Sequence, residues 1–120
     1  MPVLPEGKSV YFRDKEFNFS YATSLQELLR GLTGVTSLDP YSGMLFDFGM
    51  NHRITMTPRG LQFPVDVAFL SAEGEILSIK RLDPTNGFTQ YTDEPARFAL
   101  EVPVGFFSEN NIAIGDQFEI

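Results

Sequence analysis

The segment 63–81 constrains the fold most, because it predicts two strands joined by a short turn. Residues 63–70 are almost wholly apolar and rich in β-branched and aromatic side chains, which is typical of a strand covered on both faces. Residues 72–75 form a polar break that includes Gly74, which can adopt a positive φ, and residues 76–81 resume the apolar pattern. We therefore expect a central hairpin with Asp66 as the one acidic side chain inside its first strand.

Short alternating segments and one helical segment make up the rest of the chain. Apolar or alternating stretches predict strands at 9–13, 17–21, 44–48, 54–56, 97–102 and 118–120. Ser24 and Glu27 have the spacing of a capping box, and the leucines that follow are expected to close one face of the sheet: Leu25, Leu28, Leu29 and Leu32. The pattern predicts an all-β fold, a compact jelly-roll-like β-sandwich or barrel with one short α-helix at about 24–33. A single helical turn is expected within 104–110.

The ends of the chain and its hydropathy define the expected organisation. Pro2, Pro5 and Gly7 break regular structure, so residues 1–7 are interpreted as a flexible leader and residues 8–120 as a single β domain. The first fifteen residues carry prolines and charges where a secretory signal would be apolar. No apolar run approaches the roughly 18 residues of a membrane span. We expect a soluble protein without a membrane span, whose compartment stays open.

Charge and rare residues exclude several classes of function. The formal net charge is −7 and the nine Lys and Arg residues are scattered, which argues against a nucleic-acid surface. The chain has no cysteine and a single histidine, His52, so a zinc site or a Ser-His-Asp arrangement is not expected. Phosphate-loop and dinucleotide-binding motifs are missing from the sequence. We therefore predict no metal, no cofactor and no catalytic residue.

Four charged residues form the candidate binding cluster. Asp66 lies in an apolar strand, so its carboxylate must find donors or a cation. Two interpretations stay open: a structural anchor that accepts from loop N–H groups or pairs with Arg59 or Arg97, and a ligand-binding carboxylate. Arg97 and Glu101 share one strand face. They could join Arg59 and Asp66 in one polar cluster, or they could simply belong to a solvated sheet face.

Aromatic residues in loops form a second candidate. Tyr41, Phe88 and Tyr91 lie in turn-rich segments, as does Met50. If they converge, they would form an exposed patch for a partner or a sugar ring. If they fold inward, they would extend the core.

Several motifs come in an order that resembles the bacterial and archaeal family called domain of unknown function 192. They are the segments 43–48 (GMLFDF), 63–70 (FPVDVAFL), 95–102 (PARFALEV) and 114–116 (IGD). The resemblance implies a compact, jelly-roll-like all-β domain without an established activity, in a family whose members are often exported. The family pattern FWMKN aligns with residues 56–60, where the tryptophan is lost, Arg59 replaces lysine and Gly60 replaces asparagine.

Three functions fit these observations. The first is a non-catalytic binding or structural module for a small polar ligand or a protein. The alternative is an oligomeric surface or particle-decoration protein that forms homo-oligomers or larger assemblies. A third is a glycan-active enzyme that uses Asp66 and Glu101 as a carboxylate pair, which requires both carboxyl groups to face one open cleft.

Overall fold

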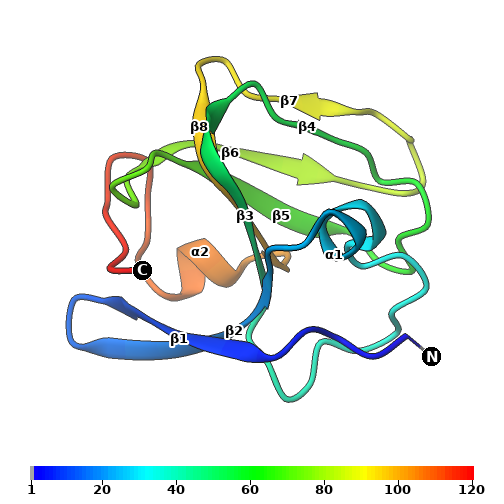
Figure 1. Cartoon of the computed structure of the whole chain (residues 1–120), viewed down its shortest axis with the longest axis horizontal. Helices are drawn as coiled ribbons and strands as arrows, with labels where there is room; N and C mark the ends of the chain where they lie inside the picture. Colours follow the sequence, from blue (N-terminus) through cyan, green and yellow to red (C-terminus); the bar gives the residue numbers. More distant parts are fainter. Residues whose placement is uncertain (1) are drawn as a thin grey trace.

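The computed structural model describes residues 2–120 and contains one large sheet with a small one beside it (Figure 1). The large sheet has six strands in the order β1-β2-β3-β8-β5-β6, with β1 (Gly7–Phe12), β2 (Lys15–Ala22), β3 (Met44–His52), β8 (Ala96–Pro103), β5 (Val65–Leu70) and β6 (Ile76–Leu82). Only β2 and β3 pair in parallel. The short strands β4 (Thr55–Met56) and β7 (Gln90–Tyr91) form the second sheet. The all-β prediction is confirmed, and the large sheet is open because β1 and β6 are its edges.

The expected central strand is β5, which is an interior strand between β8 and β6, but the hairpin of β5 and β6 is not central because β6 is an edge of the sheet. All six of its residues are buried, which confirms that both faces are covered. The turn that follows depends on Gly74, whose φ is +87°. A Cβ atom at this position would lie 2.2 Å from the Phe118 carbonyl oxygen, so only glycine allows the C-terminal segment to approach this turn.

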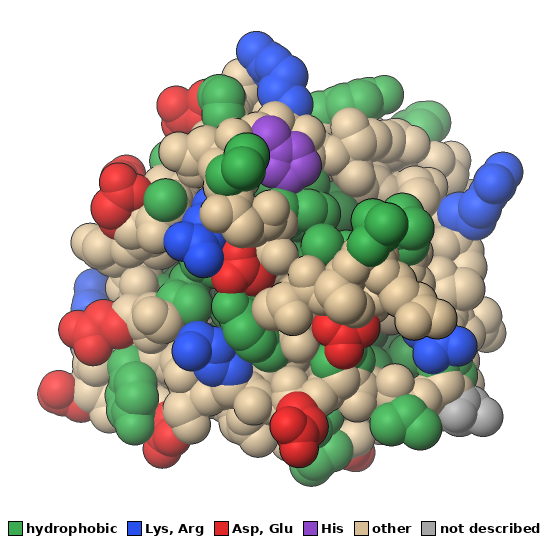
Figure 2. All heavy atoms as spheres, viewed as in Figure 1, with side chains coloured by type: hydrophobic (Ala, Val, Ile, Leu, Met, Phe, Trp, Pro, Cys, Tyr) green, Lys and Arg blue, Asp and Glu red, His purple; other side chains and the backbone are tan. Residues whose placement is uncertain are grey.

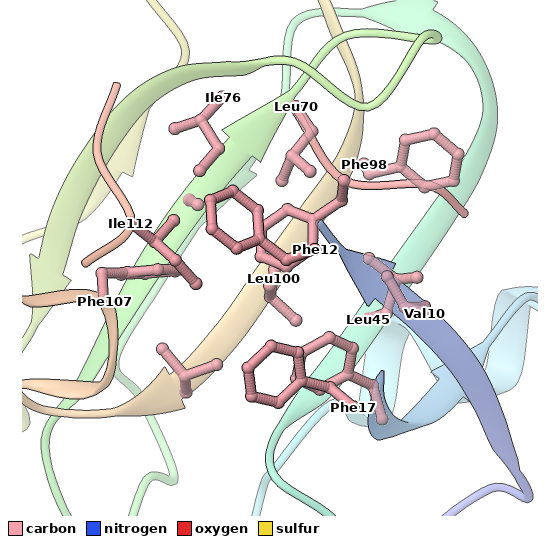
Figure 3. Packing of buried hydrophobic residues seen from close by; sticks show 14 residues of the cluster. Val10, Phe12, Phe17, Leu45, Leu70, Ile76, Phe98, Leu100, Phe107 and Ile112 are labelled. Carbon is pink, nitrogen blue, oxygen red and sulfur yellow. The ribbon is translucent and has the colours of Figure 1, made fainter. Parts of the chain in front are cut away.

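Each face of the sheet packs against its own hydrophobic cluster. The first cluster contains Phe107 of α2 (Phe106–Glu109) and side chains from most strands, shown in Figure 3. Its buried members are Val10, Phe12, Phe17, Phe19, Leu45, Ala68, Leu70, Ile76, Phe98, Leu100, Val102, Phe107, Ile112 and Phe118. The second cluster lies beneath α1 (Leu25–Arg30) and the turn after it. Its buried members are Ala22, Leu32, Val35, Leu38, Met44, Phe46, Ile54, Val65, Val67, Phe69, Leu82, Ala96 and Ala99.

The helix α1 forms as its cap predicts, but it is shorter than the predicted 24–33 segment. The Ser24 hydroxyl accepts the Glu27 N–H, and the Glu27 carboxylate accepts the Ser24 N–H, each at 3.1 Å. The helix ends at Arg30 because Gly31 leaves helical geometry with φ +52°. A helix of six residues presents a narrow face to the sheet, and only Leu28 of its leucines packs against the second cluster. The expectation that Leu25 and Leu29 close the sheet is wrong, since they are 73% and 77% exposed.

The last third of the chain differs from the predicted strands in two places. The short strand β7 lies inside the segment 82–95, where no strand was predicted. The predicted final strand at 118–120 forms only an isolated bridge, between Tyr11 and Glu119. The predicted helical turn at 104–110 is confirmed as α2, so the described chain has two short helices. Within residues 2–120, no helix is long and apolar enough to cross a membrane.

Candidate functional site

The structure distributes the four residues of the candidate polar cluster over three places. Asp66 pairs with Arg81, Arg97 pairs with Asp47, and Arg59 lies near Glu101 around a pocket. On the surface, Figure 2 shows basic and acidic side chains interspersed over the visible face.

Each carboxylate oxygen of Asp66 accepts a hydrogen bond from within the protein, as the structural-anchor interpretation requires. Its carboxylate accepts from Nε of Arg81 at 3.0 Å and from the N–H of Gly105 at 3.0 Å. The expected loop N–H donor is confirmed, whereas the expected cation, Arg59 or Arg97, is wrong. Antiparallel pairing of β5 with β6 places Asp66 opposite Arg81. The anchor therefore joins β5, β6 and the turn that begins α2.

Arg97 belongs to a network around Asp47 that sequence reasoning missed. Its guanidinium donates two hydrogen bonds to the Asp47 carboxylate, at 3.0 and 3.1 Å, and the Tyr21 hydroxyl donates a third at 2.5 Å. Burial alone would raise the pKa of Asp47, but the bonds from Arg97, Tyr21 and the Gly49 N–H lower it below the ordinary value. Burial and the bond to Asp47 raise the pKa of Tyr21 to about 12. The sequence feature that could have indicated Asp47 is the one that indicated Asp66: an acidic residue within an apolar strand.

Glu101 faces away from Asp66, across the sheet. In the pairing of β5 with β8, Asp66 lies opposite Val102 and Val67 lies opposite Glu101. Paired residues share a face and neighbouring residues along a strand do not, so the two carboxyl groups point to opposite sides. The enzyme hypothesis requires Asp66 and Glu101 to face one cleft, and the structure does not meet this requirement.

The Glu101 carboxyl is buried and has no partner. The residue is 3% exposed. No described residue donates a hydrogen bond to its side chain or forms an ion pair with it. Every described side-chain nitrogen or oxygen that is sealed from solvent has a hydrogen-bond partner, so the Glu101 oxygens must be the part that reaches an opening. Burial raises the pKa of Glu101 to about 8. A large fraction of the carboxyl is therefore protonated at neutral pH.

The opening that Glu101 reaches is a pocket of about 200 Å³, which we call the Glu101 pocket. It lies between α1 with its following turn, β3, β4 and the turn 57–61. Its lining combines an apolar wall, three threonines and three charged groups: Leu28, Leu29, Leu32, Phe46, Met56, Leu61, Thr33, Thr55, Thr57, Arg30, Arg59 and Glu101, together with Gly31. Arg59 was predicted as a site residue, whereas Arg30 was missed because it lies in the last turn of an apparently ordinary helix.

Two turns meet at the Glu101 pocket and place Arg59 there. The Gly34 N–H donates to the Gly60 carbonyl at 3.0 Å, which joins the turn after α1 to the turn that carries Arg59. Gly60 has φ +83°, and a Cβ atom there would lie 2.8 Å from the Thr33 methyl group. The glycine at this position therefore allows the close contact of the two turns.

The loop aromatic residues do not gather in one patch. Phe88 and Tyr91 are 68% and 60% exposed, and β7, which contains Tyr91, pairs with β4. Tyr41 is half-buried and borders a separate hollow with Phe63 and Phe106. Figure 1 places the segment around residue 41 and the yellow segment of β7 at opposite ends of the molecule.

The fold and the pocket define a class of small β-rich protein, with a sheet covered on both faces and a lone buried acid in a pocket at one of them. Residues 9–120 match the family DUF192, described as "Uncharacterized ACR", and the chain belongs to this family. The expected resemblance is thereby confirmed over nearly the whole chain. Among curated proteins, none matched.

Two crystal structures share the fold. A putative transcription regulator from Sinorhizobium meliloti 1021 superimposes with a TM-score of 0.89 and 24% identity, covering 99% of this chain and 97% of the other. A protein of unknown function from Novosphingobium aromaticivorans DSM 12444 superimposes with a TM-score of 0.80 and 22% identity, covering 95% and 84%. At these identities the likeness concerns the fold alone.

Proposed function

We propose that this protein is a non-catalytic binding module that takes a small polar ligand in the Glu101 pocket. One observation carries the proposal: a carboxyl group that is 3% exposed, has no partner among the described residues, and lines a pocket of about 200 Å³. A wholly buried polar group without a partner costs roughly 1–3 kcal/mol, and a carboxyl that reaches solvent only through a pocket bears part of this cost. A ligand that hydrogen-bonds to Glu101 would remove this cost.

The opposite face of the sheet offers a useful contrast. A wider hollow of about 710 Å³ is lined by Asp66, Lys80 and Arg81. Its charged groups are already satisfied, because Asp66 pairs with Arg81 and Lys80 pairs with Asp93. Size therefore favours the hollow beside Asp66, whereas unsatisfied chemistry favours the Glu101 pocket. We give more weight to the chemistry, since a few unpaired polar groups determine which ligand a pocket selects.

A ligand-detected NMR screen of small neutral and charged fragments tests the proposal. We expect fragments to bind the wild-type protein and the control variant Glu94→Gln, which changes an exposed acid outside the pocket. In Glu101→Leu, which removes both oxygens and keeps an apolar side chain, the same fragments should bind at least tenfold more weakly. Equal binding to Glu101→Leu, or no fragment that binds the wild type, would contradict the proposal.

Assembly with further copies of this chain is the second candidate. It is favoured by Leu25 and Leu29, one helical turn apart on α1, which are 73% and 77% exposed. Sedimentation at several concentrations tests it, because the double variant Leu25→Gln with Leu29→Gln should shift the protein towards the monomer. A monomeric wild type at all concentrations would exclude this candidate and leave the first unaffected.

A further inference from the structure

The Lys and Arg side chains of this acidic protein differ in whether they contact a partner group. The chain has a net charge of −7 and nine Lys and Arg residues. Most of them contact an acid, an amide or an aromatic ring: Lys8, Arg13, Lys15, Lys80, Arg81 and Arg97. Among residues 2–120, the guanidinium groups of Arg30, Arg53 and Arg59 have no such partner. Two of these three, Arg30 and Arg59, line the Glu101 pocket.

The pocket thus combines two arginines that have no partner among residues 2–120, a buried carboxyl group and an apolar wall. Arg30 and Arg59 are exposed, which places them towards the solvent side, whereas Glu101 is buried. The lining also includes apolar side chains, among them Leu28, Phe46 and Met56. A guanidinium presents a planar fork of N–H donors that matches a carboxylate. A ligand that binds both the exposed guanidinium groups and the buried carboxyl would carry an anionic group at one end, an apolar body, and a hydrogen-bonding group at the other end.

We infer that the ligand of the Glu101 pocket is a small organic carboxylate whose far end carries a carbonyl or hydroxyl oxygen, with the carboxylate on Arg30 and Arg59 and the oxygen on Glu101. This inference rests on the proposed function. The pocket, at about 200 Å³, is smaller than the ~300–1,000 Å³ typical of sites for drug-sized ligands. A nucleotide or a long acyl chain is therefore too large, and a short-chain acid fits.

The protonation of Glu101 fits the same ligand. Arg30 and Arg59 are the other charged side chains in the lining of the pocket, and the β3 and β5 residues paired with Glu101 are uncharged, Met44 and Val67. Protonated Glu101 can donate its proton to a carbonyl oxygen and adds no negative charge to a site for an anion. Ionised Glu101 can do neither, so a keto acid should bind more weakly as Glu101 loses its proton.

A matched panel tests the inference by isothermal titration calorimetry. The panel contains straight-chain oxo- and hydroxycarboxylates of four to eight carbons, the corresponding amides, unsubstituted carboxylates such as hexanoate, and alkyl phosphates of equal length. We expect an oxocarboxylate to bind wild type at least tenfold more tightly than its amide and several-fold more tightly than the unsubstituted acid. The double variant Arg30→Gln with Arg59→Gln should abolish the preference over the amide, whereas the control Arg53→Gln should retain it.

The variant Glu101→Gln separates the role of the proton from that of the side-chain shape. Its amide can donate at every pH, so we expect oxocarboxylate binding to change less than threefold between pH 6 and pH 9. In wild type, affinity should fall more than tenfold over the same range. A wild-type affinity that does not fall with pH would overturn the role assigned to Glu101.

The outcomes distinguish the inference from the proposed function. Amides that bind as tightly as carboxylates would overturn the ligand class, and neutral fragments that still depend on Glu101 would leave the binding module in place. Preference for alkyl phosphates over carboxylates would also overturn the class. If nothing in the panel binds while other fragments do, the inference fails alone. If neither the panel nor the fragments bind, the inference and the proposed function fail together.

Discussion

Asp66 and Glu101 lie on adjacent strands, one residue apart in register, yet their surroundings differ completely. Asp66 is 8% exposed and holds both Arg81 and the Gly105 N–H. Glu101 is 3% exposed, and its carboxyl has no hydrogen-bond or ion-pair partner among the described residues. The first acid connects elements of the fold, and the second is kept at a cost. The difference is why we propose Glu101, and not Asp66, as the binding residue: both acids are buried, and Glu101 is the one without a partner among residues 2–120.

The largest effect should come from replacing the titratable carboxyl group of Glu101. Its pKa of about 8 in the fold lies above the ordinary value, so the folded protein binds more protons than the unfolded chain between about pH 4.5 and pH 8. Stability is therefore lost as pH rises through this window. We expect Glu101→Gln to raise the free energy of unfolding by about 3 kcal/mol at pH 7, and by little at pH 4.

Urea denaturation at several pH values measures this effect, with Glu94→Gln as the control at an exposed acid. The control should follow the wild-type pH dependence. A Glu101→Gln variant that is less stable than wild type at pH 7 would mean that Glu101 has a partner in solution, and the contrast with Asp66 would disappear.

A change of opposite sign is expected at Asp66. The substitution Asp66→Ala leaves the Gly105 N–H without its acceptor and removes the ion pair with Arg81. We expect the free energy of unfolding to fall by about 2 kcal/mol, most of it from the partly buried N–H, because the Arg81 side chain can return to water. The same denaturation experiment at pH 7 measures it, with Glu94→Ala beside it. A loss below about 0.5 kcal/mol would show that Asp66 is no anchor.

The smallest effect concerns Asp47, a third strand acid that has several donors. Tyr21→Phe removes one hydrogen bond and leaves those from Arg97 and Gly49. We expect a loss of about 1 kcal/mol at pH 7, since one charge-assisted hydrogen bond is removed while the carboxylate keeps its other partners.

The pH dependence of Tyr21→Phe provides its check. The pKa of Asp47 is lowered in the fold, so the stability that its charge contributes is present above the ordinary pKa and is lost as pH falls through the lowered value. The difference between Tyr21→Phe and wild type should therefore shrink in acid. A difference that stays constant down to pH 2 would assign the effect to packing.

Local patterns in the sequence indicated the strands and most of their faces. The apolar run 63–70 correctly predicted the buried strand β5, and the alternation of 97–102 correctly placed Glu101 on the face opposite Phe98 and Leu100. The capping box at Ser24 correctly marked the start of α1. These features depend on residues close together in the chain, so their physical cause is visible there.

The partner of Asp66 depended on register instead. An irregularity between Phe69 and Leu70 shifts the pairing of β5 with β6, so that Asp66 lies opposite Arg81. In the unshifted register set by Leu70 and Ile76, Lys80 would be opposite Asp66. One added residue in a ladder changes every pair beyond it. A small local distortion thus decided which cation completes the anchor.

The sequence by itself determined that this protein is β-rich, that β5 is covered on both faces, and that two acids, Asp66 and Glu101, lie within apolar strands. Only the tertiary structure decided that the Asp66 carboxylate has hydrogen-bond donors and that the Glu101 carboxyl has none among residues 2–120. The reason is physical, because donors for a buried carboxylate come from whatever packs above it. The segments that pack above Glu101 are α1 and the turn 57–61, and both are far from β8 in the sequence. They contribute apolar side chains and two arginines to the pocket, but no hydrogen-bond donor in contact with the Glu101 carboxyl.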